Sequence, residues 1–179
     1  LELKSRIDQS EAIRSKIEAI FETALDCIIN IDHESRITEW NPAAENTFGF
    51  TREEILGRKL TDTIIPQSHL AGHSAGMKKL LQFGEGPILG KRIEIIAQNK
   101  QGAIFPVELA VTQIEGTENP GFTAYLRDIS VQKEAEQQMK LQSKTLEAAA
   151  NGIIITDVKG VIVWANPAFL SLTGYSDEE

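Results

Sequence analysis

Histidine and serine side chains at residues 68–73, together with the single Cys27, are the first candidates for chemistry in this chain. His69 and His73 are four residues apart, so on a helix both imidazoles would lie on one face and could hold a metal ion. No third ligand is evident, and two ligands are too few. A Ser68–His73 pair, or Cys27 with a histidine, could form a nucleophile and its base, but no catalytic motif surrounds either pair. The sequence therefore favours a binding role over catalysis.

The composition limits the class of protein. The chain has 179 residues and a net charge of −8, and its Lys and Arg residues form no cluster, which argues against a nucleic-acid surface. A single cysteine cannot build a disulfide framework. No apolar run approaches the roughly 18 residues of a membrane span. Because no signal peptide is visible and the chain begins at Leu1, we expect a cytoplasmic piece of a longer protein, with no membrane contact in this part.

The sequence repeats itself at an offset of 125 residues. Residues 21–54 align without a gap with residues 146–179, and Asn41-Pro42-Ala43 matches Asn166-Pro167-Ala168. A match of this length marks a repeat at the scale of a domain, larger than a solenoid unit. The second copy is the shorter one, so we expect one whole domain followed by the opening part of another.

The start of each copy predicts two strands and a helix. In the first copy, apolar runs at residues 27–32 and 36–40 flank a short polar turn. Asn41-Pro42 then begins a helix, because Asn caps the helix and Pro is tolerated at its first position. Gly49 ends that helix, and Thr51-x-x-Glu54 is a capping box for the next one. Helix capping also explains the neighbouring acids at this site without any catalytic role.

The rest of the first copy predicts one more helix and three longer strands. Residues 68–83 have a helical pattern whose apolar and imidazole side chains share one face. The β-like runs are residues 88–100, 103–116 and 121–130, with a turn at Gln101-Gly102 between the first two. The predicted order is two strands, several short helices and three strands.

Polar helices are predicted on both sides of this domain, at residues 1–20 and 131–150. Their apolar residues recur at spacings compatible with heptads, which favours a parallel homodimer through these helices. The alternative is a solvated helix that packs on its own domain. The apolar residues are Leu3, Ile7, Ile17 and Phe21 in the first helix and Ala135, Met139, Leu146 and Ala149 in the second.

Together these motifs resemble the PAS (Per-Arnt-Sim) domain family. The resemblance covers residues 18–130 and again residues 146–179. It implies an α+β fold with a five-stranded antiparallel sheet in the order 2-1-5-4-3, short helices over one face and a pocket between the two layers. The matching motifs are Asn41-Pro42-Ala43, Gly49-Phe50-Thr51 with Glu53-Glu54, Gly102 and the closing Asp128-Ile129-Ser130.

The resemblance implies a sensor module that is not itself an enzyme. Tandem PAS domains joined by helices are typical of bacterial signalling proteins, including two-component systems, with a histidine kinase or a diguanylate cyclase as the output domain. A purely structural dimerisation or spacer module without a ligand is the alternative. The expected organisation is an N-terminal helix at 1–20, which could be a coiled coil, a complete PAS domain at 21–130, a linker helix at 131–145 and the start of a second PAS domain at 146–179.

Haem b is one cofactor that the resemblance implies. In the oxygen-sensing haem branch, a histidine at the position of His73 ligates the iron, and a basic residue and a Gly-Glu pair like Gly84-Glu85 follow it. That branch also places an arginine over the bound oxygen, whereas the equivalent position here is Ile93. Arg92 is one residue away and so points to the other side of its strand. The residues expected to wall the ring are Met77, Leu80, Ile93, Val107, Leu109 and Val111.

Flavin, as FAD, is the other cofactor that the resemblance implies. Trp40 and Asn41 lie where flavin-binding relatives use an aromatic and a polar group, although a packing role would also suit Trp40. Cys27 is on the first strand rather than on a helix, so we expect no light-induced flavin adduct and interpret Cys27 as a small buried group. A small-molecule ligand other than these, or no ligand at all, also stays open.

Overall fold

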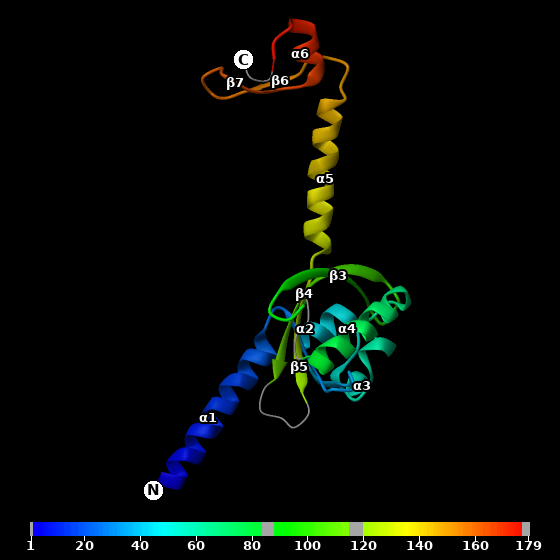
Figure 1. The fold of residues 1–179 in the computed structure, drawn as a ribbon. Helices are drawn as coiled ribbons and strands as arrows, with labels where there is room; N and C mark the ends of the chain where they lie inside the picture. Colours follow the sequence, from blue (N-terminus) through cyan, green and yellow to red (C-terminus); the bar gives the residue numbers. More distant parts are fainter. Residues whose placement is uncertain (1, 84–87, 115–119, 177–179) are drawn as a thin grey trace. The chain divides into compact units, whose positions relative to one another are not determined.

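The computed structural model describes residues 2–83, 88–114 and 120–176. Gly84-Glu85, part of the haem resemblance, lies outside these residues. The chain separates into two compact units, Leu1–Ser130 and Val131–Glu179, shown as a ribbon in Figure 1. Within the described ranges, no helix combines the length and the apolar character that crossing a bilayer requires.

An antiparallel five-stranded sheet forms the centre of the first unit, and its order is β2-β1-β5-β4-β3. This confirms the order that the resemblance implied. The first and last strands of the domain lie side by side, with Ile29 of β1 opposite Ala124 of β5. The strands are β1 (Cys27–Ile31), β2 (Ile37–Trp40), β3 (Arg92–Gln98), β4 (Ile104–Ile114) and β5 (Gly121–Asp128).

Short helices gather on one side of this sheet (Figure 1). Local signals set their ends. Asn41 Oδ1 accepts the N–H of Ala44 at 3.0 Å to cap α2 (Pro42–Phe48), and Gly49 ends it with a φ of 76°. The Thr51–Glu54 capping box is present. The remaining helices are α3 (Arg52–Ile55), the 3₁₀ turns η1 (Leu60–Asp62) and η2 (Gln67–His69), and α4 (Leu70–Phe83).

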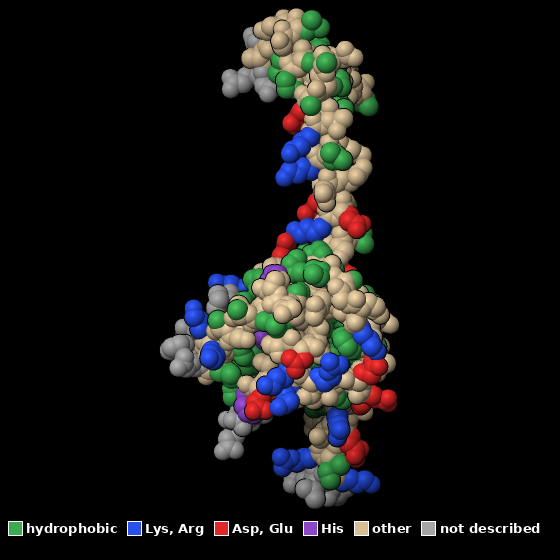
Figure 2. All heavy atoms as spheres, turned by 90° about the vertical axis from the view of Figure 1, so that its right-hand side faces the viewer, with side chains coloured by type: hydrophobic (Ala, Val, Ile, Leu, Met, Phe, Trp, Pro, Cys, Tyr) green, Lys and Arg blue, Asp and Glu red, His purple; other side chains and the backbone are tan. Residues whose placement is uncertain are grey.

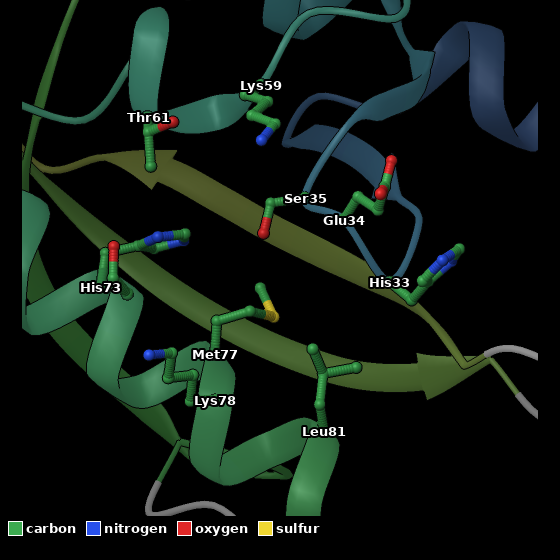
Figure 3. A pocket seen from close by; sticks show the side chains of 10 residues that line it. His33, Glu34, Ser35, Lys59, Thr61, His73, Met77, Lys78 and Leu81 are labelled. Carbon is green, nitrogen blue, oxygen red and sulfur yellow. The ribbon is translucent and has the colours of Figure 1, made fainter.

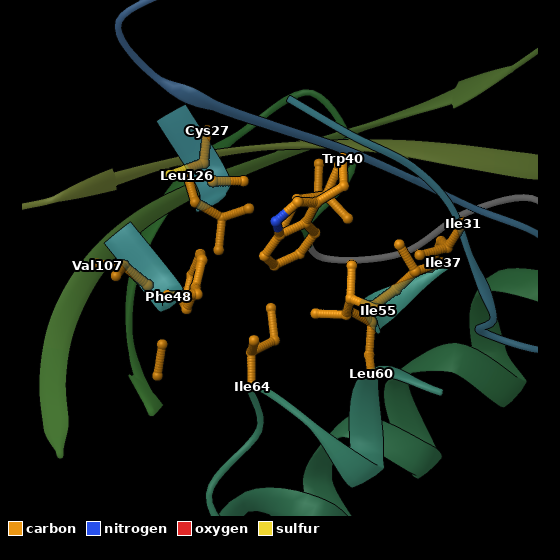
Figure 4. Close-up of a cluster of buried hydrophobic side chains, with 14 of the residues drawn as sticks. Cys27, Ile31, Ile37, Trp40, Phe48, Ile55, Leu60, Ile64, Val107 and Leu126 are labelled. Atoms are coloured by element: carbon orange, nitrogen blue, oxygen red, sulfur yellow. The ribbon is translucent and has the colours of Figure 1, made fainter. Parts of the chain in front are cut away.

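A packed apolar core fills the space between these helices and the sheet (Figure 4). Trp40, Phe48 and Val107 are at most 1% exposed. The ring of Phe48 lies between those of Trp40 and Phe105, with centroids 5.5 and 5.6 Å away. Such a tilted aromatic chain adds to the stabilisation from burying apolar area. The core therefore occupies the interior where a PAS-like pocket was expected.

Helix α1 (Glu2–Thr23) attaches to this domain through its last turn. The side chain of Arg52 lies 3.6 Å from Glu22 and 6.0 Å from the ring centre of Phe21. Phe21 thus faces its own domain rather than a free helix face. Earlier in the helix Ile7, Ile13, Ile17 and Ile20 are 51–62% exposed. Figure 2 shows hydrophobic side chains among charged ones where α1 projects from the domain.

The second unit rebuilds the start of the first. It contains α5 (Ser130–Glu147, continuing from the last residue of the first unit), the hairpin of β6 (Ile154–Thr156) and β7 (Ile162–Ala165), and α6 (Pro167–Thr173). The two strands form a sheet of their own. Ile154, Ile155 and Val163 are 42–61% exposed, because no further strands or helices among the described residues cover the hairpin.

Candidate functional site

A pocket opens between the turn that joins β1 to β2 and helix α4 (Figure 3). Its volume is about 290 Å³. The turn contributes residues 33–35, and the neighbourhood of η1 contributes Lys59 and Thr61. Residues far apart in the sequence therefore meet here. Those from α4 are His73, Ser74, Met77, Lys78 and Leu81.

His73 reaches this pocket from α4, and its imidazole points toward Ser35 in Figure 3. The side chain is half-buried, and its Nδ1 atom is buried without a hydrogen-bond partner among the described residues. Burial lowers the pKa of His73, because desolvation disfavours the imidazolium. The imidazole is therefore neutral near pH 7, and part of its hydrogen-bonding capacity is unused.

Ser35 has an unusual backbone in the same pocket. Its φ of 62° lies in the left-handed region, and no other non-glycine residue of the described part of the chain has a positive φ. Asp32 holds the turn, because its Oδ1 accepts the N–H of Glu34 at 2.8 Å and that of Arg36 at 2.9 Å. Ser35 is 8% exposed. Its hydroxyl points into the pocket (Figure 3) and bonds to none of the described residues.

Two lysines give the pocket a positive character. Lys59 and Lys78 both line it, and neither forms an ion pair with a residue that the structure describes. Among the described residues that line the pocket, Glu34 has the one carboxylate, and Arg36 Nε already engages it at 3.1 Å. In Figure 3 the ammonium group of Lys59 points into the same space as the Ser35 hydroxyl. Sequence analysis did not single out either lysine or Ser35.

Most of the residues expected around a haem belong to the core or pack against it, and two of them reach the pocket. His73 and Met77 line the pocket. Leu80, Val107 and Val111 are at most 9% exposed and belong to the packed core. The last two, Ile93 and Leu109, are half-buried register partners in the β3–β4 pair, and Leu109 packs against the core.

This arrangement does not fit a porphyrin. A macrocycle bonded to His73 needs an apolar slot beside the imidazole, whereas the space there is bordered by Ser35, Lys59 and Thr61. The apolar side chains that would wall the ring contact one another instead. Arg92 is on the outer face, as expected, where its Nη1 donates to Glu108 Oε1 at 2.8 Å. The neutral imidazole of His73 would suit an iron ligand. The residues around it do not form the apolar slot that the ring requires.

The polar groups of Trp40 and Asn41 are hydrogen-bonded within the domain and are not available to a flavin. Trp40 is 1% exposed, and its Nε1–H donates to the carbonyl of Phe50 at 3.2 Å. Asn41 is fully buried, and its Oδ1 accepts the N–H of Ile28 at 2.9 Å while its Nδ2 donates to the carbonyl of Asp26 at 3.0 Å. Every polar group of these two side chains thus has a partner, which leaves none for a cofactor.

The other candidates for chemistry lie apart from the pocket. Cys27 is buried in the core, and burial raises the pKa of its thiol. His69 lies on the surface with its Nδ1 2.9 Å from Ser68 Oγ. No group of three or more His, Cys, Asp and Glu side chains that could hold a metal is found in the described ranges. The geometry thus supports ligand binding at the α4 pocket more than metal binding or catalysis.

The sheet ends in a junction that begins helix α5. Ile129 is 5% exposed, and its N–H donates to the carbonyl of Pro106 at 3.1 Å, which ties it to β4. Asp128 Oδ1 accepts the backbone N–H of Ser130 at 2.8 Å and the Ser130 hydroxyl at 2.6 Å. The first residue of the helix is therefore bonded to the last residue of the sheet.

Several solved structures with the same fold are PAS domains of other proteins. The PAS domain of a Colwellia psychrerythraea protein has a TM-score of 0.55 at 22% identity, covering 66% of this chain and 98% of that one. A domain of the sensory box sensor histidine kinase/response regulator from Geobacter sulfurreducens has a TM-score of 0.51 at 25% identity, covering 67% and 94%.

Relatives in sequence are longer proteins. An uncharacterised protein of Azorhizobium caulinodans is 39% identical over 121 residues, 68% of this chain and 16% of that protein. The oxygen sensor protein DosP of Escherichia coli is 25% identical over 149 residues, 83% of this chain and 18% of DosP. The cell-division control histidine kinase PdhS of Brucella ovis is 29% identical over 141 residues, 79% and 13%. The chain thus spans less than a fifth of each relative.

Family comparison agrees with the fold. One PAS domain model matches residues 25–131, and a second PAS domain model matches residues 140–179. The two matches fall on the two copies of the repeat. The chain therefore belongs to the PAS domain family.

Proposed function

We propose that this chain is the sensory part of a longer bacterial signalling protein. Its PAS domain responds to a small-molecule, redox or gas signal, and α5 carries the response to an output domain in another part of that protein. The chain itself performs no catalysis. The observation that carries this proposal is the Asp128–Ser130 junction, because a displacement of β5 would move the first turn of α5 with it.

The sequence relatives support the same class of function. One is an oxygen sensor protein and another is a cell-division control histidine kinase. We infer that the output domain is a histidine kinase or a diguanylate cyclase, and that the sensory part lies in the cytoplasm.

We further propose that the chain acts as a homodimer through its flanking helices. Ile13, Ile17 and Ile20 are 54–62% exposed on α1, and their spacing of four and three residues is that of a heptad seam. In α5, Met139 and Leu146 are 63% and 38% exposed, and they are one heptad apart. Helices that pair in this way can transmit a rotation or a shift between domains.

Substitution of Asp128 by Ala tests the junction. The variant loses two hydrogen bonds at the start of α5, each worth about 0.5–1.5 kcal/mol, so the Ser130 amide should exchange at least about twofold faster with solvent deuterium. Amides of β1 and β4 should exchange as in the wild type. Glu134→Ala, an exposed change on the same helix, serves as the matched control.

In the longer protein, Asp128→Ala should also uncouple output activity from the signal, measured as phosphate transfer from ATP or cyclic dinucleotide formation from GTP. Equal exchange in the variant and the wild type would mean that the junction does not hold α5, and the proposal would fail.

A structural spacer is the second candidate function, and the packed core favours it. Trp40, Phe48 and Val107 leave the interior filled. In that case the domain would relay or separate its neighbours without a ligand. Binding of a small molecule at the α4 pocket decides between the two.

A further inference from the structure

We propose that the pocket between the β1–β2 turn and α4 binds a small organic anion, a carboxylate that carries a short aliphatic chain. As a binding site the pocket stands on its own geometry, and only its role as the signal input rests on the proposed sensory function. One space of about 290 Å³ is bordered by a strained serine, by two lysines without an ionic partner among the described residues, and by an apolar wall.

The backbone of Ser35 can be compared with that of the equivalent residue in the second copy of the repeat. Gly160 occupies the same position of the same turn in the second copy, with a φ of 85° against 62° for Ser35. The turns are built alike, since Asp157 Oδ1 accepts two backbone N–H groups at 2.9 Å as Asp32 does. Glycine adopts this backbone without strain and serine does not.

The hydroxyl of Ser35 takes no part in holding the turn. Its backbone does so, because its N–H donates to Asp32 O at 3.0 Å and its carbonyl accepts from Leu60 N at 3.1 Å. A strained residue whose side chain points into a pocket indicates a functional use of that side chain. We infer that the hydroxyl donates to a ligand oxygen.

The charged groups around the pocket select an anion. Lys59 and Lys78 have no ionic partner among the residues described, and Glu34 is held by Arg36. The imidazole of His73, which lines the pocket, is neutral, and its Nδ1 is buried without a hydrogen-bond partner among the described residues. A carboxylate would accept bonds from an ammonium group, a hydroxyl and an imidazole N–H, which together satisfy its lone pairs.

The apolar side of the pocket favours an aliphatic chain for the part of the ligand beyond its carboxylate. Met77 and Leu81 of α4 form the apolar wall of the pocket, and Leu81 is 40% exposed. An aliphatic chain placed on these side chains would remove them from water. A volume of about 290 Å³ suits a metabolite of small size and is too small for a porphyrin or a dinucleotide.

Hexanoate is the probe for this site. It is titrated into isotope-labelled protein of the full 179 residues at neutral pH and constant ionic strength, while backbone amide shifts are followed by NMR. We expect saturable shifts at residues 33–35, 59–61 and 73–78, with a Kd of about 1 mM or below. 1-Hexanol lacks the charge and hexylammonium reverses it, so both should bind at least about tenfold more weakly.

Variants assign the binding to the named groups. Lys59→Met should weaken hexanoate binding about fivefold or more. Lys79→Met is the matched control, because Lys79 is an exposed neighbour of Lys78 that does not line the pocket. Ser35→Gly should weaken binding while Tm stays equal or rises, since glycine relieves the turn. That pairing excludes unfolding as the cause of lost binding.

Three results would overturn the site: equal binding of hexanoate and 1-hexanol, equal effects of Lys59→Met and Lys79→Met, or shifts centred away from α4 and the turn. Hexanoate binding without shifts at residues 128–135 would leave the site intact and count against the sensory function. If hexanoate does not bind but Asp128→Ala speeds exchange in α5 as expected, the binding site is wrong and the sensory function still stands.

Discussion

Asn41 and Asn166 make the same hydrogen bonds at the same place in the two copies of the repeat. Asn41 Oδ1 accepts the N–H of Ile28 at 2.9 Å, and Asn166 Oδ1 accepts that of Ile153 at 2.8 Å. Each oxygen also caps the helix that follows, and both side chains are fully buried. One amide thus joins the start of the first strand to the helix that follows the second strand.

Asn41→Ala should lower the free energy of unfolding by about 3 kcal/mol, because the substitution leaves several buried backbone groups without partners. The measurement is urea unfolding followed by the fluorescence of Trp40 in a Trp164→Phe background. Gln113→Ala, an exposed change on β4, should stay within about ±0.5 kcal/mol. A loss below about 1 kcal/mol for Asn41→Ala would contradict the structural role assigned to this amide.

The buried imidazole of His73 predicts a pH dependence of stability. Burial lowers the pKa of His73 from its usual 6.5, so the unfolded chain binds the proton more readily than the folded one. The free energy of unfolding should therefore be unaffected by His73 above pH 6.5. It should fall as the pH drops from 6.5 toward the lowered pKa of His73 in the folded state. The slope for one group is at most about 1.4 kcal/mol per pH unit.

Urea unfolding of the wild type and His73→Gln across this range checks the prediction, because the difference between the two curves removes all other titrating groups. The wild-type curve should fall more steeply on acidification. Parallel curves would show that His73 is not desolvated.

The packed interior predicts weak haem binding. Titration with hemin should give a broad, non-stoichiometric Soret absorption that is the same in the wild type and in His73→Ala. The reason is that Val107, Val111 and Leu80 occupy the space of the ring. A sharp band at one equivalent, lost in His73→Ala, would show instead that the core opens to admit the cofactor.

The exposed isoleucines of α1 predict a dimer that depends on one helix face. Ile17→Glu should weaken dimerisation by about 100-fold or more, because two carboxylates would enter an apolar seam. Ser15→Glu places the same charge off that seam and should leave the Kd of the dimer nearly unchanged. Sedimentation velocity over a concentration series measures both. Equal dimerisation of the two variants would place the contact elsewhere.

The sequence by itself determined the parts of this protein that depend on neighbouring residues. The Asn41 cap, the Gly49 stop and the Thr51–Glu54 capping box are all present as predicted, because a cap needs only three or four consecutive residues. The internal repeat was also legible, and the resemblance supplied the strand order that the structure confirms.

Tertiary structure decided the character of the site. The sequence placed His73 on a helix with Met77. It did not show which neighbouring side chains would lie in the core and which would line the pocket. Val107 and Leu80 pack inward because the alternation of β4 and the rotation of α4 place them against Phe48 and its cluster. The pocket itself joins a turn, η1 and α4. Its polarity comes from side chains of these three separate segments, which meet only in the folded chain, so no local pattern encodes it.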